Sequence, residues 1–451
     1  MKKHTKLGVA ALIIFAPVAA GYFAVKSKID HALRDGSLER LVARKSGVKL
    51  GADDCGYLPL AWREMLIRSD GMVARGKPPR SLTVINAINI RAHCSLRDLW
   101  QRKWTVALLE ASHLQAAFGE AAAANVQQIL PRQPEVEPQS DTESLIKVDI
   151  LKTHIPRTDV YWGKTADHVG GFKEVDSWFD TKGRDHLDIT GRGGTFRQTG
   201  WPELKVDQLR LHWIKPKLAV ESAFFSVGQP ANLHVTGEFE FNGPLRMQLH
   251  LSVKQSPADP FVMGYWRGKF DGILDSETDL EKQPGADTKV TASGQLSFSR
   301  AVIHDVDLLA KIAAVTRHPQ FEKPKIDVLR FQYLWTGTRL EVSQFEAETK
   351  GLCRLEGDFS LENNNIQGNF RIGAAPDVVE ALPGAREKVF TESHDGYLWT
   401  PLHLSGPAKH PHEDLKSRLV AAAQEHFAKG ILAPILKPGK GLIDLLEEIY
   451  K

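Results

Sequence analysis

Histidines and aspartates gather between residues 149 and 186, so this stretch is the first candidate for chemistry. The group consists of His154, His168 and His186 with Asp149, Asp159, Asp167 and Asp185. Such side chains can bind a metal ion or act as general acids and bases. Their spacings match no metal-ligand or catalytic-triad template. We therefore interpret them as surface residues.

A second group is KHPHED, residues 409–414. On a strand, His410 and His412 would share one face. Alternatively, Glu413 and Asp414 fit the first turn of a helix, where carboxylates interact favourably with the helix dipole. We favour the helix N-terminus.

An enzyme acting on glycans is the weakest hypothesis. It would use His410 and His412, or the surroundings of Trp162 and Trp178. The glycine-rich turn at 191–194 is not followed by the lysine and hydroxyl residue of a phosphate loop, and the chain contains no GxSxG motif. We therefore expect a non-enzymatic protein without cofactor or metal.

The composition is that of a folded protein. The chain has 451 residues, of which 42% are hydrophobic and 25% charged, and its net charge is +3. This length allows two or three domains. The near balance of charge argues against nucleic acid as a partner, because nucleic-acid binding needs a concentrated basic surface.

The N-terminus predicts membrane targeting. Lys2, Lys3 and Lys6 precede residues 7–25, which carry no charge. As a helix this run would nearly span a hydrocarbon core of about 30 Å. It is either a cleaved signal peptide ending near residues 18–20 or a retained transmembrane anchor. We favour the anchor, because the apolar run continues past the cleavage position. The bulk of the chain would then lie across the membrane.

The chain has three cysteines, Cys55, Cys94 and Cys353. An exported protein meets an oxidising compartment, where two of them could pair. Cys55 and Cys94 are the candidate couple, since both lie in the N-terminal region. The alternative is three unpaired, small buried residues.

Residues 232–253 predict a hairpin with one apolar and one polar face. Leu233, Val235 and Phe239 alternate with polar residues, and the alternation resumes after the turn at 242–244. Residues 355–372 repeat the pattern around an asparagine turn. Many such strands between 145 and 374 imply an antiparallel sheet.

The expected fold is mainly β with some α structure, and we divide the chain by composition. The parts are an anchor (1–25), an α/β start (26–130), a Pro-rich linker (131–144), an antiparallel β region with a helix near 304–318 (145–374), and a helical tail (375–451).

Too few helices are expected in 145–374 to cover the apolar side of its strands. A second sheet, closure into a barrel, or a curved sheet that holds another molecule would each solve this problem. Exposure to water would not, since burial contributes about 25 cal/mol per Å². The pattern alone favours a core filled by the chain itself.

The order of these parts resembles the AsmA-like family. The resemblance rests on the N-terminal anchor and helix, on the strand–turn–helix segment TASGQLSFSRAVIHDVDLLAKIAAV, and on the strand series from DVLRFQYLWTG to NFRIG. Members of that family are membrane-anchored β-groove proteins of the Gram-negative envelope, related to chorein-type bridge proteins. The family brings no catalytic residues.

The resemblance implies that phospholipid acyl chains occupy the apolar face of a long curved sheet. The expected function is an inner-membrane-anchored, periplasmic lipid-binding protein that assists intermembrane phospholipid transfer or outer-membrane biogenesis. The alternative is an envelope scaffold or assembly factor with a dry β-sandwich core. The predicted groove residues are Phe239, Phe241, Leu245, Met247, Leu249, Phe359, Leu361, Ile366 and Phe370.

Overall fold

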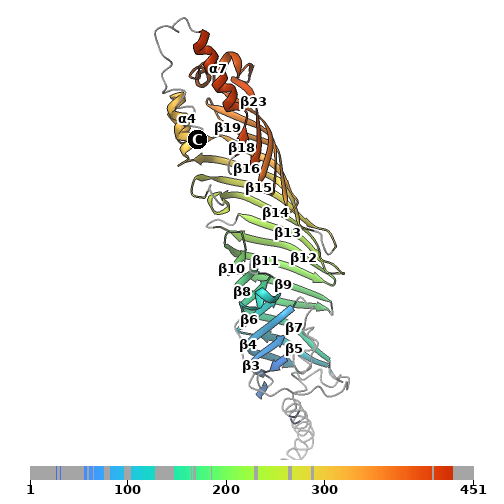
Figure 1. The fold of residues 1–451 in the computed structure, drawn as a ribbon. Coiled ribbons are helices and arrows are strands. Elements are labelled where there is room, and N and C mark those ends of the chain that lie inside the picture. Colours follow the sequence, from blue (N-terminus) through green and yellow to red (C-terminus); the bar gives the residue numbers. More distant parts are fainter. Residues whose placement is uncertain are drawn as a thin grey trace, which may run out of the picture. The chain divides into compact units, whose positions relative to one another are not determined.

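A computed structural model shows a mainly β protein with few helices, as predicted (Figure 1). No helix in its described part is both long and apolar enough to cross a bilayer. The predicted anchor at 7–25 and the Pro-rich linker at 131–144 lie outside that part. The structure describes residues 27, 31, 55–57, 60–63, 66–75, 82–95, 103–126, 147–163, 165, 169–183, 185–227, 232–262, 267–285, 289–408 and 411–429.

The chain forms two compact units, the first ending at Trp213 and the second beginning at Ile214. The first unit has one short described helix among its strands. Its elements are β1 (Cys55–Tyr57), β2 (Leu60–Arg63), β3 (Leu66–Arg75), β4 (Leu82–Ser95), β5 (Lys103–Glu110), β6 (His113–Phe118), α3 (Glu120–Ala123), β7 (Lys147–Trp162), β8 (Gly170–Gly183), β9 (His186–Arg192), β10 (Thr195–Gln198) and β11 (Leu204–Ile214).

Strand β7 departs from the predicted antiparallel pairing. It runs parallel to β5 along its first half and parallel to β6 along its second half, and it is antiparallel to β8. Parallel neighbours need a long connection. The chain between residues 126 and 147 supplies one, so the sheet of the first unit is mixed.

The second unit begins with a long series of strands and ends with helices. Its elements are β12 (Lys217–Ser226), β13 (Leu233–Glu240), β14 (Arg246–Pro257), η3 (Asp259–Phe261), β15 (Phe270–Lys282), β16 (Thr291–Ile303), α4 (Asp307–Thr316), η5 (Pro319–Phe321), β17 (Lys325–Ile326), β18 (Val328–Trp335), β19 (Arg339–Thr349), β20 (Cys353–Glu362), β21 (Asn365–Ala374), α5 (Pro376–Glu380), α6 (Ala385–Lys388), β22 (Glu392–His394), β23 (Tyr397–Pro407), β24 (His412–Glu413) and α7 (Leu415–Lys429).

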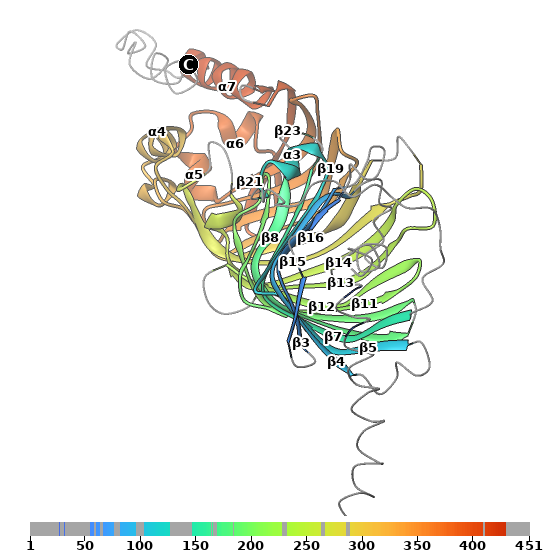
Figure 2. The same cartoon turned by 90° about the horizontal axis from the view of Figure 1, so that it is seen from below.

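The strands of the second unit pair antiparallel and largely in chain order, from β12 through β16, β18 and β21 to β23. Figure 2 shows that they curve along their length. The hairpins predicted at 232–253 and 355–372 are confirmed as β13–β14 and β20–β21. The helix predicted near 304–318 is α4.

The sheet continues past residue 374, where a helical tail was predicted. Strand β23 pairs with β21 from Asn365↔Pro407 to Ala374↔Leu398. Leu398, Leu402 and Leu404 alternate with other residues there, which is a strand pattern. The described helices α5, α6 and α7 flank this strand.

Three β-bulges are built in the same way and bend their strands. In each, a residue with positive φ donates its backbone N–H to an aspartate on the neighbouring strand. Bulges of this kind increase the local twist and bend of a sheet. The donor–acceptor pairs are Glu174–Asp159 at 2.8 Å, Gln255–Asp275 at 2.9 Å and Gln344–Asp358 at 2.8 Å.

A buried core closes the C-terminal end of the second unit. Leu352 and Val379 are fully buried at its centre, and Phe390 and Ala422 pack against them. This core joins the end of the sheet to α5, α6 and α7. It accounts for part of the apolar surface that the sequence leaves to be covered.

Candidate functional site

The strand register brings the apolar residues of the β13–β14 hairpin onto one face. Phe239 lies opposite Met247, and Gly237 lies opposite Leu249. On the preceding strand, Leu218 lies opposite Phe239. The parity that the sequence predicts is therefore the parity of the folded hairpin, and it extends to β12.

The same face continues across the sheet without a change of parity. Leu249 begins a row that crosses seven strands, each member paired with the next. The row consists of Leu249, Leu280, Ala292, Trp335, Leu340, Leu361 and Ile366. With strands about 4.8 Å apart, this row is about 29 Å long. It unites predicted groove residues that lie more than a hundred positions apart in the sequence.

A neighbouring row is also mostly apolar, and its two polar side chains hydrogen-bond each other. It runs through Leu251, Thr278, Gly294, Tyr333, Val342, Phe359 and Gly368. The hydroxyl groups of Thr278 and Tyr333 hydrogen-bond each other at 2.7 Å. We call the face that carries both rows the apolar face.

The opposite face of these strands is charged. Lys217 pairs with Glu238 at 3.1 Å, and His250 contacts Asp279 at 2.8 Å. Both nitrogens of the His250 ring face carboxylate oxygens, the other belonging to Glu277 at 3.1 Å. The hydrogen bond with Asp279, partly opposed by burial, raises the pKa of His250 above its usual value. This face is solvated, so the apolar face is where another molecule could be covered from water.

The apolar face is only partly covered by the described chain. Phe239, Met247 and Leu249 are half-buried, as are Phe359 and Leu361. Trp335, in the same row as Leu249, keeps 39% of its surface exposed. Within the described part of the second unit, α4 to α7 gather at the C-terminal end (Figure 1). The short helix η3 contacts β15, where Phe261 packs with the buried Phe270 and Leu274.

Not every predicted groove residue lies equally open on this face. Phe370 is 6% exposed, because the rings of Phe345 and Phe359 pack on it. Phe241 follows the end of β13, and 47% of its surface is exposed. Leu245 lies in the turn before β14, and Ile366 is half-buried in the row of Leu249.

Aromatic residues on β18 and β19 also lie on this face, and they are not among the predicted groove residues. Phe331 and Phe345 stack at 6.1 Å, and Phe345 contacts Phe359 at 6.1 Å. The alternation of Leu329, Phe331 and Tyr333 is visible in the sequence. The bulge at Gln344 shifts the parity of β19, so the sequence does not reveal that Phe345 shares the face.

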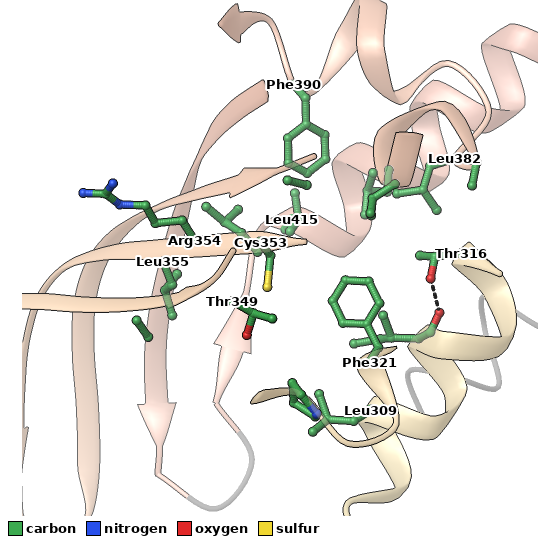
Figure 3. Close-up of a pocket in the computed structure, with 18 of the residues that line it drawn as sticks. Leu309, Thr316, Phe321, Thr349, Cys353, Arg354, Leu355, Leu382, Phe390 and Leu415 are labelled. Atoms are coloured by element: carbon green, nitrogen blue, oxygen red, sulfur yellow. Dashed lines mark hydrogen bonds between the residues drawn. The ribbon is translucent and has the colours of Figure 1, made fainter. Parts of the chain in front are cut away.

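An apolar cavity of ≈ 420 Å³ lies where this face meets the helices. Its strand side is formed by residues of the apolar face on β19 to β21, including Ala347, Cys353, Leu355 and Ile372. Figure 3 shows Phe321, Leu382 and Phe390 around the space, while the Arg354 guanidinium points away. This volume lies within the usual range of small-molecule sites, about 300–1,000 Å³.

Two polar side chains in the cavity wall, Thr316 and Cys353, are neutral. The Thr316 hydroxyl donates to the Ile312 carbonyl at 2.8 Å (Figure 3). Burial, aided by the nearby Glu348, raises the pKa of the Cys353 thiol to about 11. The thiol is therefore protonated at neutral pH, and the wall suits an alkyl chain.

Several members of the predicted chemical clusters make structural contacts, and others lie outside the described part. The ring of His154 stacks on Trp178 at 3.9 Å and contacts Asp176 at 2.9 Å. His168 and His410 are among the residues not described. The Glu413 carboxylate accepts the Lys416 N–H at 2.9 Å at the start of α7, as a helix N-terminus requires.

Buried Asp159 has a structural role in the first unit. It accepts hydrogen bonds from the Glu174 N–H at 2.8 Å and from Gln115 at 3.3 Å, and it contacts His113 at 2.9 Å. Burial alone would raise the pKa of Asp159, but these hydrogen bonds outweigh it and hold the pKa below 3.8. Its carboxylate is fully engaged in the fold.

The strand register does not favour the predicted disulfide. Cys55 pairs with Ala74, which pairs with Ile85, and Cys94 lies nine residues beyond Ile85 on β4. At about 3.3 Å per residue this is about 30 Å, whereas a disulfide joins Cα atoms less than about 7 Å apart. The side chain of Cys55 lies outside the described part.

No family model, curated protein or solved structure matches this chain.

Proposed function

We propose that the chain binds lipid acyl chains along the apolar face of its second unit. One observation carries the proposal: a continuous apolar row from Leu249 to Ile366 crosses the sheet, and the same face lines an apolar cavity further along β20 and β21. The sheet acts as a groove, and the cavity receives the end of a chain. This matches the role implied by the resemblance to AsmA-like proteins.

The energetics suit a carrier rather than a tight binder. Burial of each methylene group contributes about 0.8 kcal/mol, so ten would contribute about 8 kcal/mol relative to water. A bilayer removes the same methylene groups from water and so contributes the same free energy. The net free energy of moving a lipid from a membrane onto the apolar face is therefore small. Binding that is nearly balanced against the bilayer permits both loading and release.

The proposed cellular role follows from the predicted anchor. Residues 7–25 would hold the protein in an inner membrane with the β units in the periplasm. There it would assist phospholipid transfer between membranes or outer-membrane biogenesis. The proposed activity is non-enzymatic, and its partners are phospholipids and envelope proteins.

Lipid retention by the full chain tests the proposal. Leu249→Glu places a charge on the apolar face, and Gln248→Glu places the same charge on the opposite face of the same strand. After expression in a Gram-negative bacterium and mild-detergent purification, phospholipid per protein is measured by mass spectrometry. Lipid bound by the N-terminal segment is common to all samples and cancels in the comparison.

We expect Leu249→Glu to retain less phospholipid than the wild type and Gln248→Glu to match the wild type, with equal circular dichroism for all three. Equal lipid in all three proteins would overturn the proposal. Unfolding of Leu249→Glu alone would show that the face is ordinary core, and the scaffold function would replace the carrier function.

A further inference from the structure

His186, Asp188 and His212 lie together in the first unit. His186 and Asp188 are two residues apart on β9 and so share a face. His212 comes from β11, which pairs with β9. One ligand atom from each residue lies within 4.8 Å of the other two. This cluster plays no part in the proposed lipid binding.

The distances within the cluster fit the coordination sphere of a small metal ion. Asp188 Oδ1 lies 3.2 Å from His186 Nε2 and 2.7 Å from His212 Nδ1. Tetrahedral zinc, with ligand bonds near 2.0–2.2 Å, separates its ligand atoms by about 3.3 Å. The Asp188–His186 pair already has about this separation, and the Asp188–His212 pair needs to open by about half an ångström. The two histidine nitrogens lie within 4.8 Å of each other.

The ligand types select the class of ion. Imidazole nitrogen with a carboxylate oxygen is a donor set for zinc and related divalent transition metals, whereas calcium and magnesium prefer oxygen ligands alone.

One neighbouring cation works against the ion, and its own carboxylate partner restrains it. Lys182 Nζ lies 3.9 Å from Asp188 Oδ2 but 2.6 Å from Asp180 Oδ2. Asp180 itself lies directly opposite Asp188 across β8 and β9. Asp180 therefore draws the ammonium of Lys182 away from Asp188.

From this geometry we propose that His186, Asp188 and His212 bind one divalent transition-metal ion, zinc by preference. Three protein ligands leave one tetrahedral position for water. The exposed fraction of the side chain is 41% for His186, 40% for His212 and 27% for Asp188. An ion can therefore reach the site from solvent.

The test uses the full chain without a histidine tag, stripped with chelator and dialysed. Zinc binding is measured by calorimetry, and cobalt(II) is used as a spectroscopic substitute whose visible absorption reports tetrahedral ligation. The variants are His186→Ala, Asp188→Asn and His212→Ala. His250→Ala is the matched control, because it removes a histidine that contacts carboxylates elsewhere. Circular dichroism checks folding.

We expect one zinc ion per chain, weakened at least about tenfold in each of the three variants and unchanged in His250→Ala. Lys182→Gln removes the opposing charge, so it should bind zinc more tightly than the wild type. The proposal is overturned if folded wild type binds no stoichiometric zinc or cobalt, or if the three variants bind them as well as His250→Ala does.

Discussion

Phe359 and Phe370 stack with their ring centroids 5.9 Å apart, and each lies opposite a glycine of the neighbouring strand. Phe359 pairs with Gly368, and Phe370 pairs with Gly357. The rings therefore fill the space above backbone that carries no side chain. This arrangement packs aromatic surface closely onto the apolar face where the strands bend.

Gly357→Ala tests the close approach. A Cβ at this position would lie 2.3 Å from the Asn369 carbonyl oxygen and 2.8 Å from the Phe370 ring, and φ is +157°. We expect the free energy of unfolding to fall by about 2 kcal/mol or more, measured by thermal or urea unfolding. Gly183→Ala is the control, since a Cβ there meets nothing within 4 Å. It should change stability by less than about 0.5 kcal/mol. A similar loss in both variants would contradict the steric explanation.

Asp358→Leu tests the bulge in β19. The Asp358 carboxylate accepts the Gln344 N–H at 2.8 Å, and Gln344 has a φ of 53°. Loss of this acceptor should destabilise the protein by about 1–3 kcal/mol, because hydrogen bonds to charged groups contribute that much. Asp358→Asn keeps an oxygen acceptor and should lose less. Equal stability of the two variants would show that the bulge does not need the carboxylate.

Cys353 should react slowly with alkylating reagents. Burial raises the pKa of its thiol from 9.0 to about 11, so the reactive thiolate is about a hundredfold rarer near pH 8. Iodoacetamide labelling of the native and the urea-unfolded chain, mapped by mass spectrometry, measures this directly. Labelling of Cys353 at the same rate in both states would contradict its partly buried position beside the cavity.

His318 and Asp377 form a pH-dependent contact between two segments beside the cavity. His318 Nε2 lies 3.0 Å from Asp377 Oδ2, and Nδ1 lies 2.7 Å from the Thr316 carbonyl oxygen. Both partners are acceptors, so the ring makes both bonds only when protonated. The hydrogen bond with Asp377, and then that with Thr316, raises the pKa of His318 above 6.5. The hydrogen bond from His318 lowers the pKa of Asp377 below 3.8.

The two shifts define a pH window for this contact. The His318 contribution is complete below pH 6.5 and is lost as pH rises through the raised pKa. The Asp377 contribution is complete above pH 3.8 and is lost as pH falls through the lowered pKa. His318→Gln should therefore lower the melting temperature most near pH 5 and least near pH 8. The exposed His394→Gln is the control, and a His318→Gln effect that does not vary with pH would contradict the prediction.

Much of the second unit can be predicted from the sequence. The alternation in residues 232–253 and 355–372 gives the strands, their turns and the shared face, because register follows the side that must leave water. It also predicts that Leu249 and Leu361 lie on the same side of a sheet. That they stand in one row depends on every intervening strand, which no local pattern specifies.

The cavity and the histidine cluster depend on contacts between distant parts of the chain. Cys353, Phe321 and Leu415 meet only after α4 and α7 fold against the sheet. His212 reaches Asp188 from 24 positions away, and it was not among the histidines that drew attention in the sequence. The strand at 397–407 was assigned to a helical tail, because short helices surround it.

Photocrosslinking in living cells tests the central claim most directly. The full chain carries p-benzoylphenylalanine in place of Leu249 or Leu361 on the apolar face, or in place of Gln248 or Ser360 on the opposite face of the same strands. Cells of a Gram-negative bacterium are labelled with radioactive phosphate and irradiated. The account predicts that radioactive phospholipid attaches to the protein at 249 and 361 and not at 248 and 360. Absence of label at all four positions, or equal label on both faces, would contradict it.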